Sequence, residues 1–371
     1  MPRNVVTAFL RTSADRPLQT LSAAARYRVH VSRAFHLSVL KAAVAHPVTA
    51  HGLPPNAPPP APTLGDRVKR QTEGDSDTGD SQPREPKKPI ALKQRFWKNV
   101  DVQKRQGGDY EVLLDKRPVR TPSKSALTIP PTKPYLAHAI ALEWDVLTSA
   151  QQALKNHMIP LTSLTARAGD IMQEDAAGIT TVRDQILTTA MRYLETDTLL
   201  CWMPEQSDHI PEEVDESGKR RETLRESQMR VAKDIIAFLS TKVWPGIKIV
   251  PVLDSNSIFP ASQPQATKEI IRQWIQGLEG HDLAALERGI LASKSLLIAA
   301  RLVGDWSENY RHLQRPGQPK FGIEEAAEAS SLEVRWQTDM WGEVEDTHDV
   351  DKEDLKRQLG SVIILVSGET R

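Results

Sequence analysis

The sequence predicts a small α+β domain followed by a globular bundle of α-helices. Short alternating segments separated by Gly and Pro turns occupy residues 96–129, which is the pattern of a small sheet. After Pro160 the apolar residues recur at helical spacing, and Pro and Gly residues interrupt them at regular intervals. All eight Trp residues lie between Trp97 and Trp341, so we expect the folded region to begin near residue 90.

Residues 1–42 have the composition of a mitochondrial transit peptide. They contain six Arg and one Lys against a single acid, Asp15, together with many Ser, Thr and Ala residues. The segment 33–38 also resembles a matrix-processing site, with Arg before a large apolar residue. The alternative is a disordered basic arm that binds anionic partners. We therefore expect import into the mitochondrial matrix.

Residues 43–90 form the next segment, which we interpret as a disordered spacer. Ten of the 26 Pro residues lie between Pro47 and Pro89, and an acidic, Gly- and Ser-rich stretch follows the Pro tract. Such a composition buries too little apolar surface to offset the entropy lost on ordering.

Residues 91–155 are expected to form the small α+β domain. Strands are predicted at 96–102 and 110–114, with a tight hairpin at Asp115-Lys116 and further short strands at 118–122 and 126–129. A helix is predicted over residues 133–148. A unit of this size gains little stability by itself, so we expect it to pack on its neighbour.

Residues 156–371 are expected to form the helical domain. Apolar spacing predicts helices at about 160–172, 176–200, 217–241, 264–278, 282–303, 322–342 and 351–358. The β-branched run at 361–366 predicts a terminal strand or a buried tail. No internal repeat is visible, which disfavours a solenoid.

Composition excludes several classes of protein. With the single cysteine Cys201, disulfide frameworks and Cys-based metal sites are excluded. Residues 1–42 carry +6 and the whole chain is neutral, so residues 43–371 carry about −6, which disfavours nucleic acid as a partner. The most apolar stretch, 289–303, is too short to span a membrane and contains Lys294 and Arg301. We expect no nucleic-acid or membrane partner.

The helix predicted from Ile323 to Gly342 contains an unusual carboxylate. At about 100° per residue, Leu332, Trp336, Met340 and Trp341 fall on one apolar arc, and Glu333 falls inside it. An unpaired carboxylate on a buried face costs several kcal/mol. Glu333 is therefore either paired within the protein or faces a partner, and periodicity alone leaves both open.

The sequence lacks the common catalytic motifs. It has no phosphate-binding loop, dinucleotide-binding motif, nucleophile elbow or zinc-protease motif. An acidic run at 343–354 surrounds His348 and suggests either a solvated helix end or a hard-cation site, although its spacing matches no calcium loop. Acidic residues also accompany Trp144, Trp202 and Trp341, which are either packing anchors or anchors for a protein partner. We expect no catalytic residue, metal or cofactor.

Six segments, in order, resemble one known family. They are Arg95-Phe-Trp-Lys98, the hairpin 110–122, Glu143-Trp-Asp145, Met158-Ile-Pro-Leu-Thr162, Tyr193-Leu-Glu-Thr-Asp-Thr-Leu-Leu-Cys-Trp202, and Leu332-Glu333 with Trp341-Gly342. Over about residues 92–366 the chain resembles the mitochondrial ATP synthase F1 assembly factors that chaperone the alpha subunit.

The resemblance implies a small α+β domain, an orthogonal helical domain, matrix location and no enzymatic activity. It also implies that Glu333 is critical to chaperoning and that Trp144 matters for function. From this we expect partner-binding residues at Glu333, Trp341, Trp336 and Trp144, with the F1 alpha subunit as client and a monomeric chaperone. The alternatives are a matrix hydrolase that uses the acidic cluster 343–354 with His348, or a subunit held permanently in a complex.

Overall fold

The computed structural model describes residues 94–204, 218, 220–253, 259–314, 317–344 and 347–369. The expected transit peptide 1–42 and spacer 43–90 lie outside the described residues. The described residues belong to one compact unit, Arg84–Arg371. The expected division of this unit at residues 155 and 156 stays a prediction.

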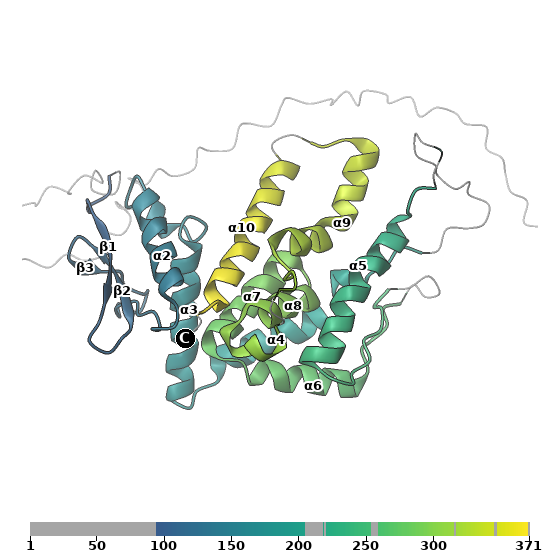
Figure 1. Cartoon of the computed structure of the whole chain (residues 1–371), viewed down its shortest axis with the longest axis horizontal. Coiled ribbons are helices and arrows are strands. Elements are labelled where there is room, and N and C mark those ends of the chain that lie inside the picture. Colours follow the sequence, from purple (N-terminus) through teal and green to yellow (C-terminus); the bar gives the residue numbers. More distant parts are fainter. Residues whose placement is uncertain are drawn as a thin grey trace, which may run out of the picture. The chain divides into compact units, whose positions relative to one another are not determined.

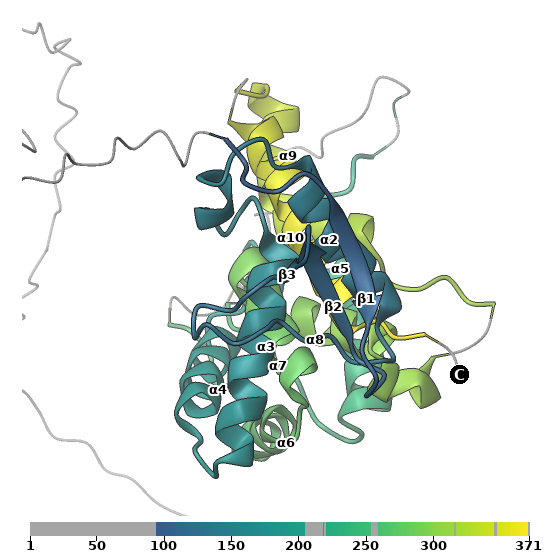
Figure 2. The ribbon, with the colours of Figure 1, turned by 90° about the vertical axis from the view of Figure 1, so that its left-hand side faces the viewer.

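The described chain begins with a three-stranded antiparallel sheet in the order β1, β2, β3. Its strands are β1 (Val100–Lys104), β2 (Tyr110–Leu114) and β3 (Arg117–Pro118). The hairpin after β2 turns at Asp115, which has a positive φ and whose carboxylate accepts N–H groups from Lys98 and Asn99. Helix α2 (Pro134–Val146) packs on β1 and β2, as Figure 2 shows.

Three predicted strands are wrong in extent. The strand expected at 118–122 is reduced to β3 and an isolated bridge at Arg120. The strand expected at 96–102 begins only at Val100, because Trp97 is turned inward and packs edge-on against Trp144 with ring centroids 5.4 Å apart. The strand expected at 126–129 is reduced to isolated bridges formed by Ala126 and Ile129. Burial of a short apolar run does not require a regular ladder.

The rest of the described chain is helical (Figure 1). Its further α-helices are α3 (Pro160–Ala176), α4 (Thr181–Leu194), α5 (Leu224–Phe238), α6 (Gln265–Gln276), α7 (Gly280–Ser293), α8 (Leu296–Trp306), α9 (Ile323–Trp341) and α10 (His348–Val366). Short helices are η2 (Gln152–Leu154), η3 (Thr198–Leu200), η4 (Leu239–Val243) and η5 (Glu308–Leu313). The predicted fold class, a small α+β part followed by helices, is confirmed.

Two helix predictions and one strand prediction need correction. The helix expected at 282–303 is two helices, since Lys294 has a left-handed φ of 58° and the Ser295 hydroxyl caps α8 by accepting the N–H of Ile298. The helix expected at 176–200 is α4 followed by η3. The run 361–366 is the end of α10 and not a strand, because its buried side chains pack on α7 and α3, and this burial overrides β propensity.

Helices α7 and α8 form the centre of the helical part, and almost every side chain of α8 is buried. The two helices approach closely at Gly289, where an added methyl group would lie 2.9 Å from Ala299 Cβ. Asp197, just before η3, connects η3 to the start of α8 through hydrogen bonds. Its Oδ1 accepts the N–H of Leu199 at 3.0 Å, and its Oδ2 accepts the N–H of Leu297 at 3.1 Å. Complete burial raises the pKa of Asp197 to about 6.

The two ends of α2 are fixed to helices that follow later in the chain. Near its C-terminal end, Glu143 Oε1 accepts the N–H of Leu161 at 2.6 Å, and its Oε2 accepts the N–H of Thr162 at 3.0 Å. Glu143 therefore caps the N-terminus of α3 in place of a local capping residue. At the other end, buried Lys133 donates to the carbonyl of Val366 at 3.0 Å and forms an ion pair with Glu308 at 2.7 Å.

Figure 1 shows the C-terminal end of α9 and the N-terminal end of α10 extending past α7 and α8 on the same side of the fold. Only the first half of α9 is buried, at Ala326, Ala327 and Ala329. Within the described ranges, no helix combines the length and the apolar character that a membrane span requires.

Candidate functional site

Helix α9 does not keep one apolar arc along its length. Ser331 departs from helical geometry, with φ −116° and ψ 15°, and its hydroxyl donates to the carbonyl of Ala327 at 2.7 Å. Such bonds to the preceding turn bend helices. After this kink the helix leaves the body of the fold. The part of the apolar arc that contains Glu333 is therefore not buried in the fold, and Glu333 is exposed.

Glu333 lies on the side of α9 that faces the segment after η3. Its Oε1 accepts a hydrogen bond from Gln337 on the same helix at 3.3 Å. Burial raises the pKa of the Cys201 thiol, and the carboxylates of Asp197 and Glu333 add to this shift. Within the described part of the chain, no Lys or Arg forms an ion pair with Glu333. Its charge is thus available to a partner at low desolvation cost.

The aromatic residues predicted for this site differ in exposure. Trp341 ends α9 and is 80% exposed, directly before Gly342, which has a positive φ of 88°. Trp336 is half-buried. Met340 and Val334 are also exposed on this half of the helix. A large exposed indole beside other apolar side chains is typical of a protein-binding surface.

Neighbouring elements contribute residues that the sequence did not single out. Arg221, just before α5, lies with Nη1 4.0 Å from Met340 Sδ. Arg225 donates to the carbonyl of Met203 at 2.8 Å, and its guanidinium lies 5.9 Å from the centroid of the Trp202 ring. Met203 is exposed. The Trp202 segment was noted in the sequence, but its approach to α9 depends on tertiary structure.

We call these side chains the Glu333 surface. It consists of the exposed C-terminal half of α9 with the Arg side chain beside it: Glu333, Val334, Trp336, Met340, Trp341 and Arg221. Methionine and Trp side chains adapt to irregular apolar partners, while Glu333 and Arg221 supply charges of opposite sign. The arrangement is suited to binding a protein and contains no nucleophile paired with a base.

Trp144 does not belong to this surface. It lies on α2, half-buried, and its Nε1 donates to Thr162 Oγ1 at 3.0 Å. The same hydroxyl donates to Glu143 Oε2 at 2.9 Å. Burial raises the pKa of Glu143, although the hydrogen bonds from Leu161 and Thr162 oppose this. The structure thus places Trp144 in the joint between α2 and α3.

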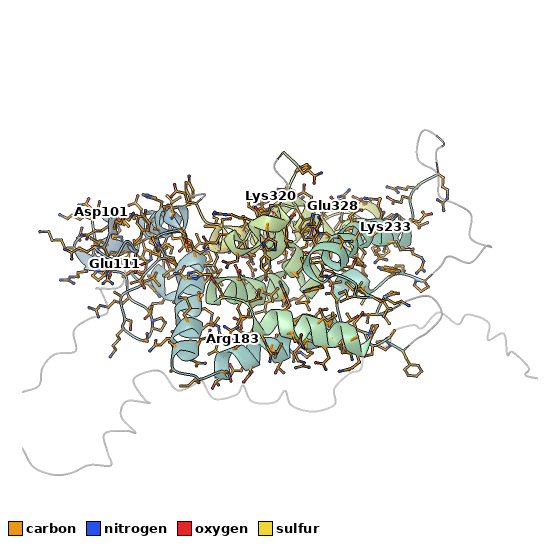
Figure 3. All side chains as sticks on the ribbon, turned by 60° about the horizontal axis from the view of Figure 1, so that its bottom comes forward. Asp101, Glu111, Arg183, Lys233, Lys320 and Glu328 are labelled. Atoms are coloured by element: carbon orange, nitrogen blue, oxygen red, sulfur yellow. The ribbon has the colours of Figure 1, made fainter. Side chains whose placement is uncertain are left out.

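A small hollow of about 200 Å³ lies between α5, α8 and α9. Its lining residues are Arg230, Val231, Asp234, Ile235, Arg301, Phe321, Glu325 and Glu328. The guanidinium of Arg301 lies 3.4 Å from the centroid of the Phe238 ring and pairs with Asp305 at 3.0 Å. Figure 3 labels Glu328 on α9 near Lys233 on the adjacent α5. The charges that line this hollow are largely paired already, as Arg230 is with Glu222.

The acidic run at 343–354 is in part a helix start. His348 begins α10, and its Nδ1 accepts the N–H of Val344 at 3.1 Å. In the part of the chain that the structure describes, no three or more His, Cys, Asp or Glu side chains are grouped to hold a metal ion. Residues 345 and 346 lie outside the described ranges.

Comparison with known proteins identifies the family. The family model described as ATP12 chaperone protein matches residues 94–240. The mitochondrial protein atp12 of Schizosaccharomyces pombe is 32% identical over 271 residues, which cover 73% of this chain and 81% of the relative. The chain belongs to the ATP12 chaperone family. The mitochondrial ATP12 protein of Saccharomyces cerevisiae is 29% identical over 296 residues, which cover 76% of this chain and 86% of the yeast protein.

Solved structures of ATP12 proteins share the fold. Atp12 from Paracoccus denitrificans has a TM-score of 0.51 at 22% identity and covers 73% of this chain and 97% of its own. A point mutant of the same Paracoccus protein gives a TM-score of 0.51 at 21% identity and covers 73% of this chain and 96% of its own. A putative chaperone from Agrobacterium tumefaciens gives the same TM-score at 19% identity, covering 73% of this chain and 84% of its own.

The resemblance to the ATP synthase F1 assembly factors is therefore confirmed, and the chain is an ATP12 assembly chaperone and not an enzyme. The relatives are named as mitochondrial proteins. The hydrolase alternative based on His348 is abandoned, because a chaperone role is not enzymatic. Trp144 lies within the residues that the family model matches, whereas Glu333, Trp336 and Trp341 lie beyond them.

Proposed function

We propose that this ATP12 family member binds unassembled F1 alpha subunit in the mitochondrial matrix and prevents its aggregation until it pairs with beta. The Glu333 surface carries this proposal, because it exposes Trp341 and Met340 beside a carboxylate that has no cationic partner within the described residues. Unassembled subunits expose apolar interface that aggregates unless it is covered. Family membership supports the chaperone role, and the choice of client follows the motif resemblance.

In the proposed complex, Trp341 and Met340 pack on apolar surface of alpha that beta later covers. Glu333 pairs with an Arg of the client, which gives the contact its register. Competition by beta for the same surface releases the client. A nucleotide-driven release is not required, since the sequence contains no phosphate-binding loop.

Trp144 enters the proposal as a residue that positions the small sheet and α2. Its indole and Glu143 share the Thr162 hydroxyl, so loss of the indole loosens the joint between α2 and α3. We also propose that the transit peptide 1–42 directs the chain to the matrix and that the mature chaperone is a monomer. Sedimentation velocity of the purified chain tests the monomer.

The decisive experiment measures capture of purified alpha subunit and suppression of its aggregation. We expect Glu333→Lys to reduce capture at least tenfold while the far-ultraviolet spectrum stays unchanged. Asp339→Lys is the matched control, because it makes the same charge change on the same helix about 120° away. Equal capture by wild type and a folded Glu333→Lys variant would remove this carboxylate from the mechanism.

A further inference from the structure

The outer face of α2 is the second large exposed apolar region of the described chain. Apart from Phe259 and Trp341, the five most exposed large hydrophobic side chains all come from residues 96–154. They are Phe96, Tyr135, Leu142, Val146 and Leu154. Single exposed apolar residues are ordinary on protein surfaces, but a contiguous group of them marks an interaction site.

Three members of this group lie on α2, and the helical spacing places them on one side of it. Tyr135, Leu142 and Val146 are separated by seven and four residues, so their side chains project in nearly the same direction. The other sides of α2 are occupied. Leu136 and Ile140 are buried, where α2 packs on β1 and β2, and Glu143 and Trp144 bond to the start of α3.

This face ends on the same side of the fold as the Glu333 surface. Helix α2 runs antiparallel to α10, because Lys133 at its start bonds the carbonyls of Val366 and Ser367 at the end of α10. Hydrogen bonds from Arg357 and Gln358 lower the pKa of Asp354 on α10 against the effect of its burial, and the nearby charge of His157, which follows α2, adds to the lowering. In Figure 1 the C-terminal half of α2 and the N-terminal half of α10 therefore extend to the same side of the fold, and they diverge from the joint at Lys133.

An acidic ridge separates the two apolar regions. The first turns of α10 expose Asp349, Asp351 and Glu353, while Lys352 is the one base among residues 349–354. From the sheet side to the α9 side, the surface is apolar, then acidic, then apolar again. Its complement is a polypeptide with basic residues flanked by apolar ones.

We propose that the outer face of α2, with Tyr135, Leu142 and Val146, is a second docking surface for the same client. This inference rests on the proposed function, and it specifies a client segment whose basic residues lie over the acidic ridge. The client then bridges both apolar regions at once. Two linked contacts hold a flexible client more tightly than either contact alone.

The test compares the double variant Leu142→Asp/Val146→Asp with wild type in binding of purified alpha subunit, using the full chain. We expect at least a tenfold weaker affinity with an unchanged thermal midpoint, because both side chains are already exposed. Ile179→Asp is the matched control. Ile179 is 49% exposed in the turn between α3 and α4, on another part of the fold, and its replacement should leave affinity unchanged.

The possible results of these binding measurements distinguish the second docking surface from the proposed function. Wild-type affinity in the folded double variant would overturn the second docking surface while leaving the proposed function intact. Failure of the wild type to bind alpha at all would instead refute the proposed function. Self-association that the double variant abolishes would assign this face to a second copy of the chain, which also overturns the proposal. A further loss of affinity in Asp351→Lys/Glu353→Lys would support the basic client segment.

Discussion

At the scale of single residues, the contact between Glu143 and Thr162 explains two of the sequence motifs together. Glu143-Trp-Asp145 and Met158-Ile-Pro-Leu-Thr162 are separate in the chain, yet they are the two halves of one joint. The carboxylate supplies the acceptors for a helix that starts at Pro160 and has no capping side chain of its own. Trp144 and the Thr162 hydroxyl complete the network.

Glu143→Ala should lower the free energy of unfolding by about 1–3 kcal/mol, because it leaves the first N–H groups of α3 without acceptors in a half-buried site. Urea unfolding followed by circular dichroism measures this. Glu143→Gln keeps one acceptor and should cost less. An alanine variant as stable as wild type would show that the cap contributes nothing.

Asp197 should give the stability of the protein a recognisable pH dependence. Its folded pKa of about 6 lies above the ordinary 3.8, so the folded state binds the extra proton between these values. The stability that it contributes is therefore present at pH 4 and declines, by roughly 3 kcal/mol, as the pH rises through 6. His281 acts with the opposite sign, since burial lowers its pKa from 6.5 to about 4 and stability is lost as the pH falls through this range.

The measurement is the difference in urea midpoint between wild type and Asp197→Asn at pH 4, 5, 6 and 7. This difference removes the contribution of His281, which both proteins share. As the pH rises from 4 to 6, the urea midpoint of wild type should fall relative to that of Asp197→Asn. A difference in urea midpoint that stays constant from pH 4 to pH 6 would contradict the assignment to Asp197.

At the scale of elements, α9 shows where a regular helical projection fails. The pattern from Ile323 correctly predicted a helix, whose first half is buried at Ala326 and Ala329. The bonds from Ser330 and Ser331 to the preceding turn then bend the helix, and everything after the bend lies on a different face. A constant angle per residue could not anticipate the exposure of Glu333.

The packing of α7 on α8 should be sensitive to one methyl group. Gly289→Ala places Cβ 2.9 Å from Ala299 Cβ, and this overpacking should lower the unfolding free energy by about 1–3 kcal/mol. Gly169→Ala in α3 is the control, since its Cβ would meet nothing within 4 Å, and it should stabilise by about 0.5–1 kcal/mol. Thermal melts of both variants measure the contrast, and equal shifts would refute the close approach.

At the scale of the whole molecule, the sequence predicted most of the fold but less of the site. Helical spacing and the hairpin at Asp115 are local signals; the hairpin and most helices were predicted correctly, whereas the breaks at Lys294 and after Leu194 were missed. The end of α10 was misjudged as a strand because its burial against α7 is decided by residues far away in the chain. The same applies to Arg221, whose approach to Met340 of α9 no local pattern encodes.

One hydrophobic cluster runs from Trp97 to Val366. We therefore expect the described unit to unfold in a single transition, even though sheet and helices come from different stretches of sequence. Circular dichroism at 222 nm and Trp fluorescence should give the same midpoint. Two separated transitions would instead support independent domains divided near residue 155.

The clamp of Lys133 on the end of α10 has a consequence for the order of events during folding. The carbonyl groups of Val366 and Ser367 that Lys133 requires are among the last residues of the described chain to be synthesised. Because the chain is synthesised from its N-terminus, Lys133 cannot form these hydrogen bonds until α10 is complete. A chain truncated after Leu359 should be cleaved by protease near residues 130–134, where the full chain resists. This result would show that α10 must be complete before the start of α2 is fixed in the fold.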